Sequence, residues 1–257
     1  MPYHFGWFST GRDEAARELL QVVKDKMDDG VIPGELSFVF CNRERGESAE
    51  SDHFLDLVRS IGVPVITFSS GRYEPNLRQK SLEEWRSRYH EAVMERIIPY
   101  YHDIIVLAGY MLIVSPQMCR RHDMINLHPA LPDGPTGAWE EVIDELIRQR
   151  SSATGVMMHL VTEELDRGPV VTYCVFPLQG SHLDHLWDTD HGERGELFWR
   201  IRAEGVRREI PLIVLTLKAL AEGSIRTEEG RVMDDTGEAQ LGGVSLTEEV
   251  EQYLKGM

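Results

Sequence analysis

The chain has 257 residues, 42% of them hydrophobic and 27% charged, which is enough for one large domain with a sizeable core. Its 27 basic and 43 acidic residues give a formal net charge of −16, which disfavours DNA or RNA as the main partner. Three widely spaced cysteines, no apolar run long enough to cross a bilayer and no visible secretory signal favour a cytoplasmic protein over a disulfide scaffold or membrane protein.

Strand-like and helix-like patterns alternate along the first half of the chain. Short apolar runs that predict strands lie at 4–9, 36–41, 63–68, 103–109 and 124–128. Apolar residues at helical spacing predict helices over 13–26, 51–61 and 81–101. This alternation predicts an α/β fold with a mostly parallel, twisted sheet flanked by helices.

The pattern becomes less regular in the second half. We expect a helix over 136–150, strands over 153–161 and 169–175, and a last helix over 197–221, interrupted at Gly205 or Pro211. From residue 226 to 257 the chain reads as an acidic C-terminal extension, in which a small hairpin could form around Glu229 and Gly230.

Asn126 and His128 form the first candidate site, at the end of a predicted strand. Side chains two apart in a strand point to the same side, so an amide and an imidazole could together hold a carbonyl oxygen that gains negative charge. Pro129 then keeps the chain out of a helix. Taken alone, the two residues fit equally an amide that caps a turn and a core histidine.

Asp166 is the second candidate, in a turn between two predicted strands. A carboxylate beside an imidazole raises the pKa of the ring and fixes its orientation. The competing interpretation is an exposed loop acid paired with the neighbouring Arg167.

Two further polar segments attract attention. The turn Ser9–Asp13 joins a strand to a helix, whose N-terminus could receive an anion, although a plain helix cap explains it as well. His182, Asp184, His185, Asp188, Asp190 and His191 could suggest a metal site, but a polar loop is the better interpretation, and we expect no metal.

The chain resembles the formyltransferases that use 10-formyltetrahydrofolate, closest to the phosphoribosylglycinamide formyltransferases. Four segments carry the resemblance: 8–13, 107–116, 125–129 and 155–170, the last reading GVMMHLVTEELDRGPV. It covers roughly residues 3–225, and implies a Rossmann-like catalytic domain over 1–225 followed by the extension 226–257.

The resemblance also implies a site. Asn126, His128 and Asp166 would be catalytic. The folate would lie against Met111, Leu112, Ile113, Val114, Val161, Glu164 and Leu165, and the amine substrate against Gly11, Arg12, Asp13, Gly109 and Pro129. The implied reaction moves a formyl group from 10-formyltetrahydrofolate to the primary amine of a small phosphorylated acceptor, first of all glycinamide ribonucleotide in purine biosynthesis.

Three departures from the family's pattern concern the acceptor. The loop 130–137 is altered and shorter, the turn 11–13 carries Arg12 and Asp13, and residues 205–209 replace a segment that contributes an acid. Another amine, such as an amino-sugar nucleotide, and hydrolysis of formyltetrahydrofolate therefore stay open. The expected partners are the amine and the folate, with a homodimer possible and no nucleic acid or membrane.

Overall fold

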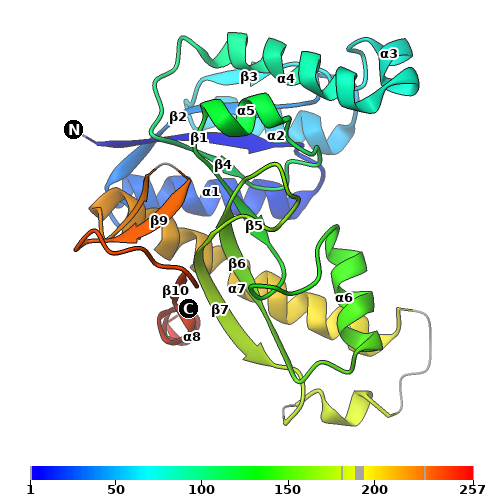
Figure 1. Ribbon diagram of the computed structural model, residues 1–257, viewed down its shortest axis with the longest axis vertical. Helices are drawn as coiled ribbons and strands as arrows, with labels where there is room; N and C mark the ends of the chain where they lie inside the picture. Colours follow the sequence, from blue (N-terminus) through cyan, green and yellow to red (C-terminus); the bar gives the residue numbers. More distant parts are fainter. Residues whose placement is uncertain (1, 181, 189–193, 229, 257) are drawn as a thin grey trace. The chain divides into compact units, whose positions relative to one another are not determined.

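A computed structural model of the chain describes residues 2–180, 182–188, 194–228 and 230–256 (Figure 1). It divides into two compact units, and the chain passes from the first to the second inside one strand, between Asn126 and Leu127. The first unit comprises Met1–Asn126 and Val161–Glu164, and the second Leu127–Leu160 and Leu165–Met257.

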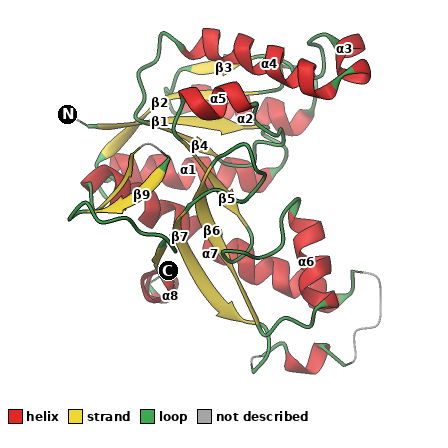
Figure 2. Cartoon of the chain, viewed as in Figure 1, coloured by secondary structure: helices red, strands yellow, loops and turns green. Residues whose placement is uncertain are grey.

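The first unit alternates strands and helices (Figure 2). Its strands are β1 (Tyr3–Ser9), β2 (Gly34–Cys41), β3 (Val65–Thr67), β4 (Ile104–Leu107) and the start of β5 (Met124–His128). Its helices are α1 (Glu14–Asp28), α2 (Ala49–Ser60), α3 (Pro75–Lys80), α4 (Leu82–Ile97) and α5 (Pro116–Arg121).

The strands of the first unit are all parallel and lie in the order β3-β2-β1-β4-β5. The chain therefore runs outward from β1 to one side and then restarts on the other side with β4. In open sheets of this kind, ligands bind beyond the carboxyl ends of the strands where the order reverses. That point lies between β1 and β4.

The core of the first unit is aromatic. All four residues of β4 are buried, as expected for a central strand covered on both faces. Around it pack the buried side chains Phe8, Phe38, Phe40, Trp85, Tyr89, Val93, Met94, Ile97, Ile105, Leu107, Tyr110, Val114, Met118 and Met124.

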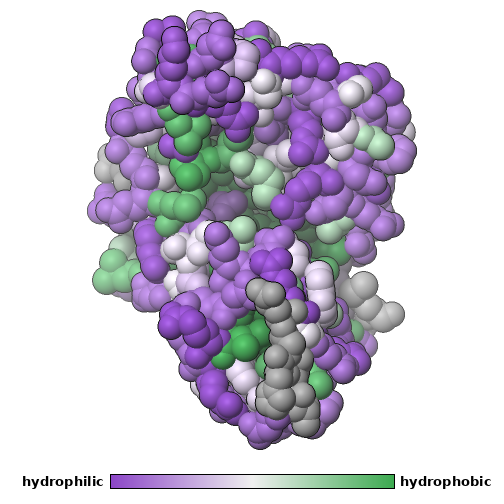
Figure 3. Space-filling model, turned by 90° about the vertical axis from the view of Figure 1, so that its right-hand side faces the viewer, coloured by the Kyte–Doolittle hydropathy of each residue, from purple (hydrophilic) through white to green (hydrophobic). Residues whose placement is uncertain are grey.

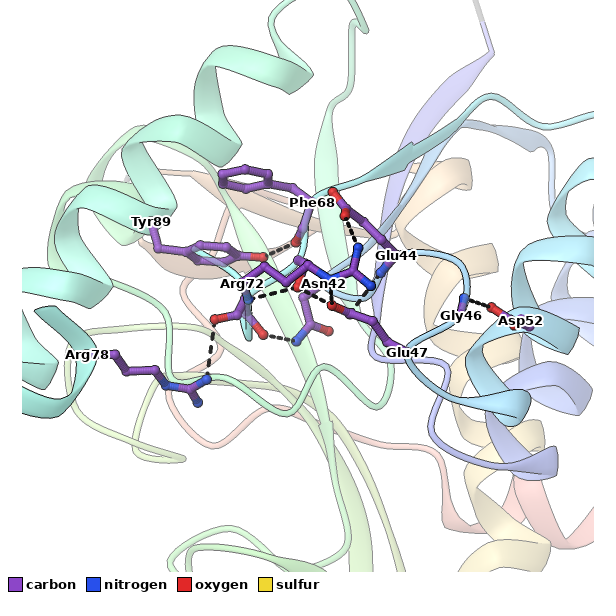
Figure 4. Close-up of polar contacts among 11 residues, drawn as sticks. Asn42, Glu44, Gly46, Glu47, Asp52, Phe68, Arg72, Arg78 and Tyr89 are labelled. Atoms are coloured by element: carbon purple, nitrogen blue, oxygen red, sulfur yellow. Dashed lines mark hydrogen bonds and ion pairs between the residues drawn. The ribbon is translucent and has the colours of Figure 1, made fainter. Parts of the chain in front are cut away.

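A polar network ties the loops at the carboxyl ends of β2 and β3 to each other (Figure 4). The guanidinium of Arg72 bridges Glu44 at 3.1 Å and Glu47 at 3.0 Å. On α4, the hydroxyl of Tyr89 donates to the carbonyl of Phe68 at 2.6 Å. Helix α4 is thereby fixed against the sheet, so its side chains can serve as rigid supports.

The second unit contains the remaining helices and strands. They are α6 (Trp139–Arg148), β6 (Ala153–Leu160), β7 (Val170–Pro177), a 3-10 turn (Asp184–Leu186), α7 (Glu196–Glu222), β8 (Ile225–Glu228), β9 (Arg231–Asp234), β10 (Val244–Ser245) and α8 (Thr247–Lys255). Strands β6 and β7 are antiparallel, and β10 runs parallel to β7. One core cluster consists of Ala130, Val142, Ile143, Leu146, Phe176, Leu178, Leu183, Leu186, Leu197, Phe198 and Ile201.

The last helix of the expected domain corrects the sequence analysis. Helix α7 runs unbroken from Glu196 to Glu222, so the interruption expected at Gly205 or Pro211 is wrong. Pro211 costs a backbone hydrogen bond, but it lies on a buried face with Leu212 and Leu217, and packing of that face stabilises the helix.

The C-terminal segment is folded onto the second unit. The expected hairpin is confirmed as β8 and β9, although Glu229 at its turn lies outside the described residues. Beyond it, Val244 of β10 pairs with Thr172, and the amide of Leu246 donates to the carbonyl of Tyr173 at 2.8 Å. The division of the chain at residue 225 stays a prediction.

Most residues on the face drawn in Figure 3 are hydrophilic, and hydrophobic side chains gather in limited areas. Within the described part of the chain, no helix is both long and apolar enough to cross a membrane.

Candidate functional site

In the first unit, two hydrogen bonds donated by backbone amides join the turn after β1 to the loop after β4. The amide of Thr10 donates to the carbonyl of Gly109 at 3.0 Å, and the amide of Met111 donates to the hydroxyl of Thr10 at 2.9 Å. Gly109 has φ +69°, a left-handed conformation that suits glycine. These bonds close the point between β1 and β4 where the strand order reverses.

The loop that follows Gly109 presents apolar side chains at every second position. Met111 is 50% exposed and Ile113 is 44% exposed, whereas Tyr110 and Val114 are buried in the core. Leu112 is partly buried against the same core. Met111 and Ile113 are thus available to a ligand, whereas Val114, also expected at the folate, lies mainly inside the protein.

The turn Gly11–Asp13 is shaped by one glycine and one helix cap. Gly11 has φ +58°, and an added Cβ would lie 2.8 Å from the side chain of Phe54. Asp13 is the N-cap of α1 and accepts from the amide of Ala16 at 3.1 Å. Asp13 therefore acts as the plain cap that the sequence left open, and its charge already occupies the helix N-terminus.

Arg12 lies exposed beside this cap. Its Nε is 3.4 Å from Asp13 Oδ2, and its Nη1 lies 3.7 Å from the sulfur of Met111. The side chains of Arg12 and Asp13 are 40% and 49% exposed, so water screens their interaction. Arg12 can therefore turn towards an anionic ligand at little cost.

Asn126 ends the first unit's part of β5 and pairs in register with Leu107 of β4. It is partly buried and lies two residues before His128 in the same strand, as the sequence predicted. Asn126 thus lies in the middle of β5, beside the last residue of β4.

In the second unit, three ionisable side chains gather inside the protein. His128 Nδ1 lies 3.7 Å from Asp166 Oδ2, and His159 Nε2 lies 3.6 Å from Asp166 Oδ1. The side chains of all three are between 3% and 7% exposed. The structure thus brings His128 and Asp166 together and adds His159.

The surroundings of Asp166 rule out the exposed acid considered from the sequence. Its carboxylate accepts from the amide of Gly137 at 3.0 Å, while Arg167 instead donates to the carbonyl of Gly134 at 3.2 Å. Asp166 also has φ +53°, a conformation that asparagine and aspartate tolerate better than other residues with side chains. The backbone therefore turns the carboxylate inward.

Both nitrogens of His128 face acceptors. Nε2 lies 2.9 Å from the carbonyl of Pro135, which can only accept, so Nε2 carries a proton. Nδ1 faces Asp166. Burial lowers the pKa of His128, while the charge of Asp166 and the Pro135 carbonyl raise it, and the balance leaves it below its ordinary value.

Opposing effects also act on Asp166. Burial raises its pKa, but the contact with His159 and the hydrogen bond from Gly137 lower it, as does the charge of His128. The balance is a pKa below the ordinary value, so the carboxylate stays ionised beside the two imidazoles.

His159 and the loop 130–137 were not predicted from the sequence as parts of this cluster. His159 sits in β6, an otherwise mostly apolar strand, and a lone histidine among buried residues was the available signal. No sequence pattern announced that the backbone of Pro135 and Gly137 would contact His128 and Asp166. Those contacts also explain why α6 begins at Trp139 and not at the expected residue 136.

The other residues expected at the folate and the amine lie on loops. Val161 packs against the core of the first unit, and Glu164 is exposed there. In the second unit, Leu165 is 45% exposed and Pro129 is partly buried. Their roles stay predictions.

The described residues of the histidine-rich segment form no metal site. Among the residues that the structure describes, no group of three or more potential metal ligands gathers. His182 instead faces Glu204 at 3.6 Å. Asp190 and His191, which belonged to the candidate cluster, lie outside the described residues.

Known proteins resemble this chain in sequence. The profile of the family described as formyl transferase matches residues 14–179. The phosphoribosylglycinamide formyltransferase of Schizosaccharomyces pombe is 28% identical over 182 residues, which cover 67% of this chain and 84% of that protein. Formyltetrahydrofolate deformylase 2 of Arabidopsis thaliana is 28% identical over 163 residues, covering 63% of this chain and 43% of that protein.

Solved structures share the fold. The phosphoribosylglycinamide formyltransferase of Coxiella burnetii superposes with a TM-score of 0.70 at 20% identity, covering 95% of this chain and 99% of that one. The expected α/β architecture, with a mostly parallel sheet flanked by helices, is confirmed.

Proposed function

The chain belongs to the formyl transferase family, and we propose that it moves the formyl group of 10-formyltetrahydrofolate to the primary amine of a small phosphorylated acceptor, with glycinamide ribonucleotide as the first candidate. The observation that carries the proposal is the buried pair His128–Asp166, in which one histidine faces a carboxylate and a carbonyl at once. Such a pair can exchange a proton near neutral pH.

The reaction requires a neutral amine. Its nitrogen attacks the formyl carbon, and the carbonyl π bond opens to give a tetrahedral centre with a negatively charged oxygen. The bond from that carbon to N10 of the folate then breaks while the carbonyl re-forms. One proton leaves the attacking nitrogen and one reaches the departing folate nitrogen, so the products are a formamide and tetrahydrofolate.

Asn126 supplies a hydrogen bond to the oxyanion. A neutral amide donor costs little to place on β5, and it stabilises the charge only once the charge has developed. A single donor of this kind contributes about 3–4 kcal/mol to the transition state.

His128 acts through its charge. Protonation of Nδ1 gives an imidazolium whose two N–H groups are directed at the Pro135 carbonyl and the Asp166 carboxylate. Because the Nε2 proton is engaged with Pro135, Nδ1 is the ring atom at which the proton comes and goes. The positive charge stabilises the oxyanion, and burial makes the protonated state readily reversible.

Asp166 supports this exchange. It stays ionised, faces Nδ1 of His128 and carries protons between the attacking amine and the folate nitrogen through water. His159 and the amide of Gly137 hold the carboxylate in place from its other side, which makes His159 a positioning residue.

Binding of the two substrates is assigned by the family's pattern. The pteridine ring is expected against the exposed Met111 and Ile113, with Leu112, Val114, Val161, Glu164 and Leu165 around it. Arg12, exposed next to Asp13, is the cation available to the phosphate of the acceptor. Gly11, Asp13, Gly109 and Pro129 are expected at the acceptor from the family's pattern alone. The cysteines Cys41, Cys119 and Cys174 are all free, which suits a reducing cytoplasm.

Hydrolysis of the formyl donor is the second candidate, because a formyltetrahydrofolate deformylase is among the relatives at 28% identity. Water would then replace the amine, and formate would replace the formamide. The altered loop 130–137, held by Pro135 and Gly137, is the reason to test other amines as well.

One experiment separates these reactions. The protein is incubated with a stable 10-formyl folate analogue, with and without glycinamide ribonucleotide, and release of the deformylated folate is followed by absorbance. We expect release only with the acceptor. Release at the same rate without it would establish hydrolysis, and no release despite folate binding would redirect the search to another amine, such as an amino-sugar nucleotide.

A further inference from the structure

A buried histidine on α4 is hydrogen-bonded to a tyrosine in the loop after β4. His90 is fully buried and Tyr110 is 7% exposed. Nδ1 of His90 lies 2.9 Å from the carbonyl of Arg86 and must donate to it, because a carbonyl only accepts. In the neutral ring Nε2 is then an acceptor, and the hydroxyl of Tyr110 donates to it at 3.2 Å.

This tautomer is stable under ordinary conditions. Burial lowers the pKa of His90 to about 4, so the ring is neutral near pH 7 and Nε2 keeps its lone pair. Helix α4 is itself fixed by the hydrogen bond from Tyr89 to Phe68. The acceptor offered to Tyr110 therefore has one chemical state and one position.

Tyr110 lies between the two residues that begin the loop, Gly109 and Met111. Thr10 already holds the backbone on both sides of Tyr110, through the carbonyl of Gly109 and the amide of Met111. The ring of Tyr110 packs edge-on against Phe8, with centroids 5.4 Å apart. The hydroxyl–imidazole bond adds a directional contact at the inner end of this side chain, which helps to set how deeply the side chain enters the core.

The depth of Tyr110 determines what the loop exposes. Because buried and exposed side chains alternate from Tyr110 to Val114, inward placement of Tyr110 turns Met111 and Ile113 outward. We propose that the His90–Tyr110 hydrogen bond is a positioning device that holds this loop in the conformation that binds the formyl donor. The inference rests on the proposed function, since it assumes that Met111 and Ile113 contact the folate.

The physical gain is preorganisation. A loop already held in its bound conformation loses less conformational entropy when the ligand arrives, so donor affinity rises without a new contact. Removing the hydroxyl leaves Nε2 of His90 buried without this partner. The conformation in which the ring of residue 110 lies deep in the core is then less favoured over other conformations of the loop. Neither residue touches the reacting atoms, so the rate of the chemical step is unaffected.

Tyr110→Phe is the direct test, because it keeps the ring and removes only the hydroxyl. The dissociation constant of the stable 10-formyl folate analogue is measured by calorimetry, and kcat and both KM values are measured by folate release. We expect the dissociation constant of the folate analogue and the KM of the formyl donor to rise about three- to tenfold, the equivalent of one buried hydrogen bond. The kcat and the KM of the acceptor should stay within about twofold of the unaltered values.

Two further variants make the result specific. His90→Leu removes the acceptor and is expected to lower the affinity for the folate analogue as Tyr110→Phe does. His90→Gln retains an acceptor oxygen and is expected to keep part of that affinity. Adding Tyr110→Phe to His90→Leu is expected to weaken binding no further, because the bond is already lost. The matched control is Tyr101→Phe, which removes an exposed hydroxyl bonded to Asp103, and it should bind the donor like the unaltered chain.

The outcomes distinguish a failure of the proposed function from a failure of the positioning role alone. If the unaltered chain binds no folate analogue, the proposed function is wrong and this inference falls with it. If the unaltered chain binds the analogue and Tyr110→Phe binds it equally well, only the positioning role is overturned. Equal losses in kcat and donor affinity, or additive effects in the double variant, would also contradict that role.

Discussion

Two pairs of neighbouring ionisable residues belong to the residues assigned to the reaction, and they occupy very different surroundings. His128 and Asp166 are 3% and 7% exposed, whereas Arg12 and Asp13 are 40% and 49% exposed. In the first pair, burial lowers the pKa of His128, whereas the pKa of Asp166 is lowered by its polar partners against the opposing effect of burial. The second pair is screened by water and contributes little until a ligand displaces that water.

The difference teaches where chemistry and where recognition reside. A buried pair has few partners, so each proton is coupled to its neighbours, which suits catalysis of a proton transfer. An exposed pair is adaptable and suits capture of a charged substrate. Substitutions in the two regions should therefore alter different kinetic constants.

The largest effect is expected in the buried pair. His128→Gln keeps a polar side chain of similar size but removes the charge that stabilises the oxyanion, and kcat should fall at least about 10³-fold. Folate release with saturating substrates measures it. His53→Gln, an exposed histidine on α2, is the control and should be fully active.

Asn126→Ala is expected to come next. Loss of one oxyanion donor should lower kcat by about 10²–10³-fold and leave the KM of the folate nearly unchanged, because the donor acts mainly in the transition state. The exposed Asn76→Ala serves as the control. A loss confined to KM would mean that Asn126 binds the substrate and does not stabilise the oxyanion.

His159→Leu should have an intermediate effect. It removes the contact that lowers the pKa of Asp166, so that pKa should rise and kcat should fall about tenfold. As the pH falls, a carboxylate with a raised pKa becomes protonated at a higher pH than before. The acid limb of the pH–rate profile should therefore move to higher pH. An unchanged profile would limit His159 to a packing role.

The smallest effect belongs to the exposed pair. Arg12→Ala should raise the KM of the phosphorylated acceptor about three- to tenfold with kcat unchanged. Added salt should narrow the difference in KM between the variant and the unaltered chain. Arg45→Ala, another exposed arginine of the first unit, is the matched control. If Arg12→Ala left the acceptor KM unaltered, the turn after β1 would not be the phosphate site.

Local pattern predicted most of the fold. The apolar runs located β1 to β7 to within a few residues, because buried strands appear in the sequence as nearly continuous apolar runs, above all the parallel strands β1 to β5. Strand β5 was predicted with both ends correct. The short helices α3, α5 and α8 were not expected. Six to nine residues carry too little periodicity to be recognised, and α3 and α5 begin with prolines that read equally well as turns.

The residues of the candidate site likewise divide into those that the sequence predicted and those that it did not. Asn126, His128 and Asp166 could be named from a motif, and the closeness of His128 to Asp166 is confirmed in the second unit. His159 was overlooked although a lone histidine in an apolar strand was a signal, and the carbonyl of Pro135 left no signal in the sequence. Their roles depend on which side of β6 faces inward and on the path of an irregular loop, and both are decided by tertiary packing.

Asp166→Asn gives the most direct test that the buried pair carries out the transfer. The substitution preserves shape and removes the charge beside His128. We expect acceptor-dependent folate release to fall at least about 10²-fold, with folate affinity and thermal unfolding close to those of the unaltered chain. Release at nearly the native rate by a folded Asp166→Asn protein would contradict a catalytic role for this pair.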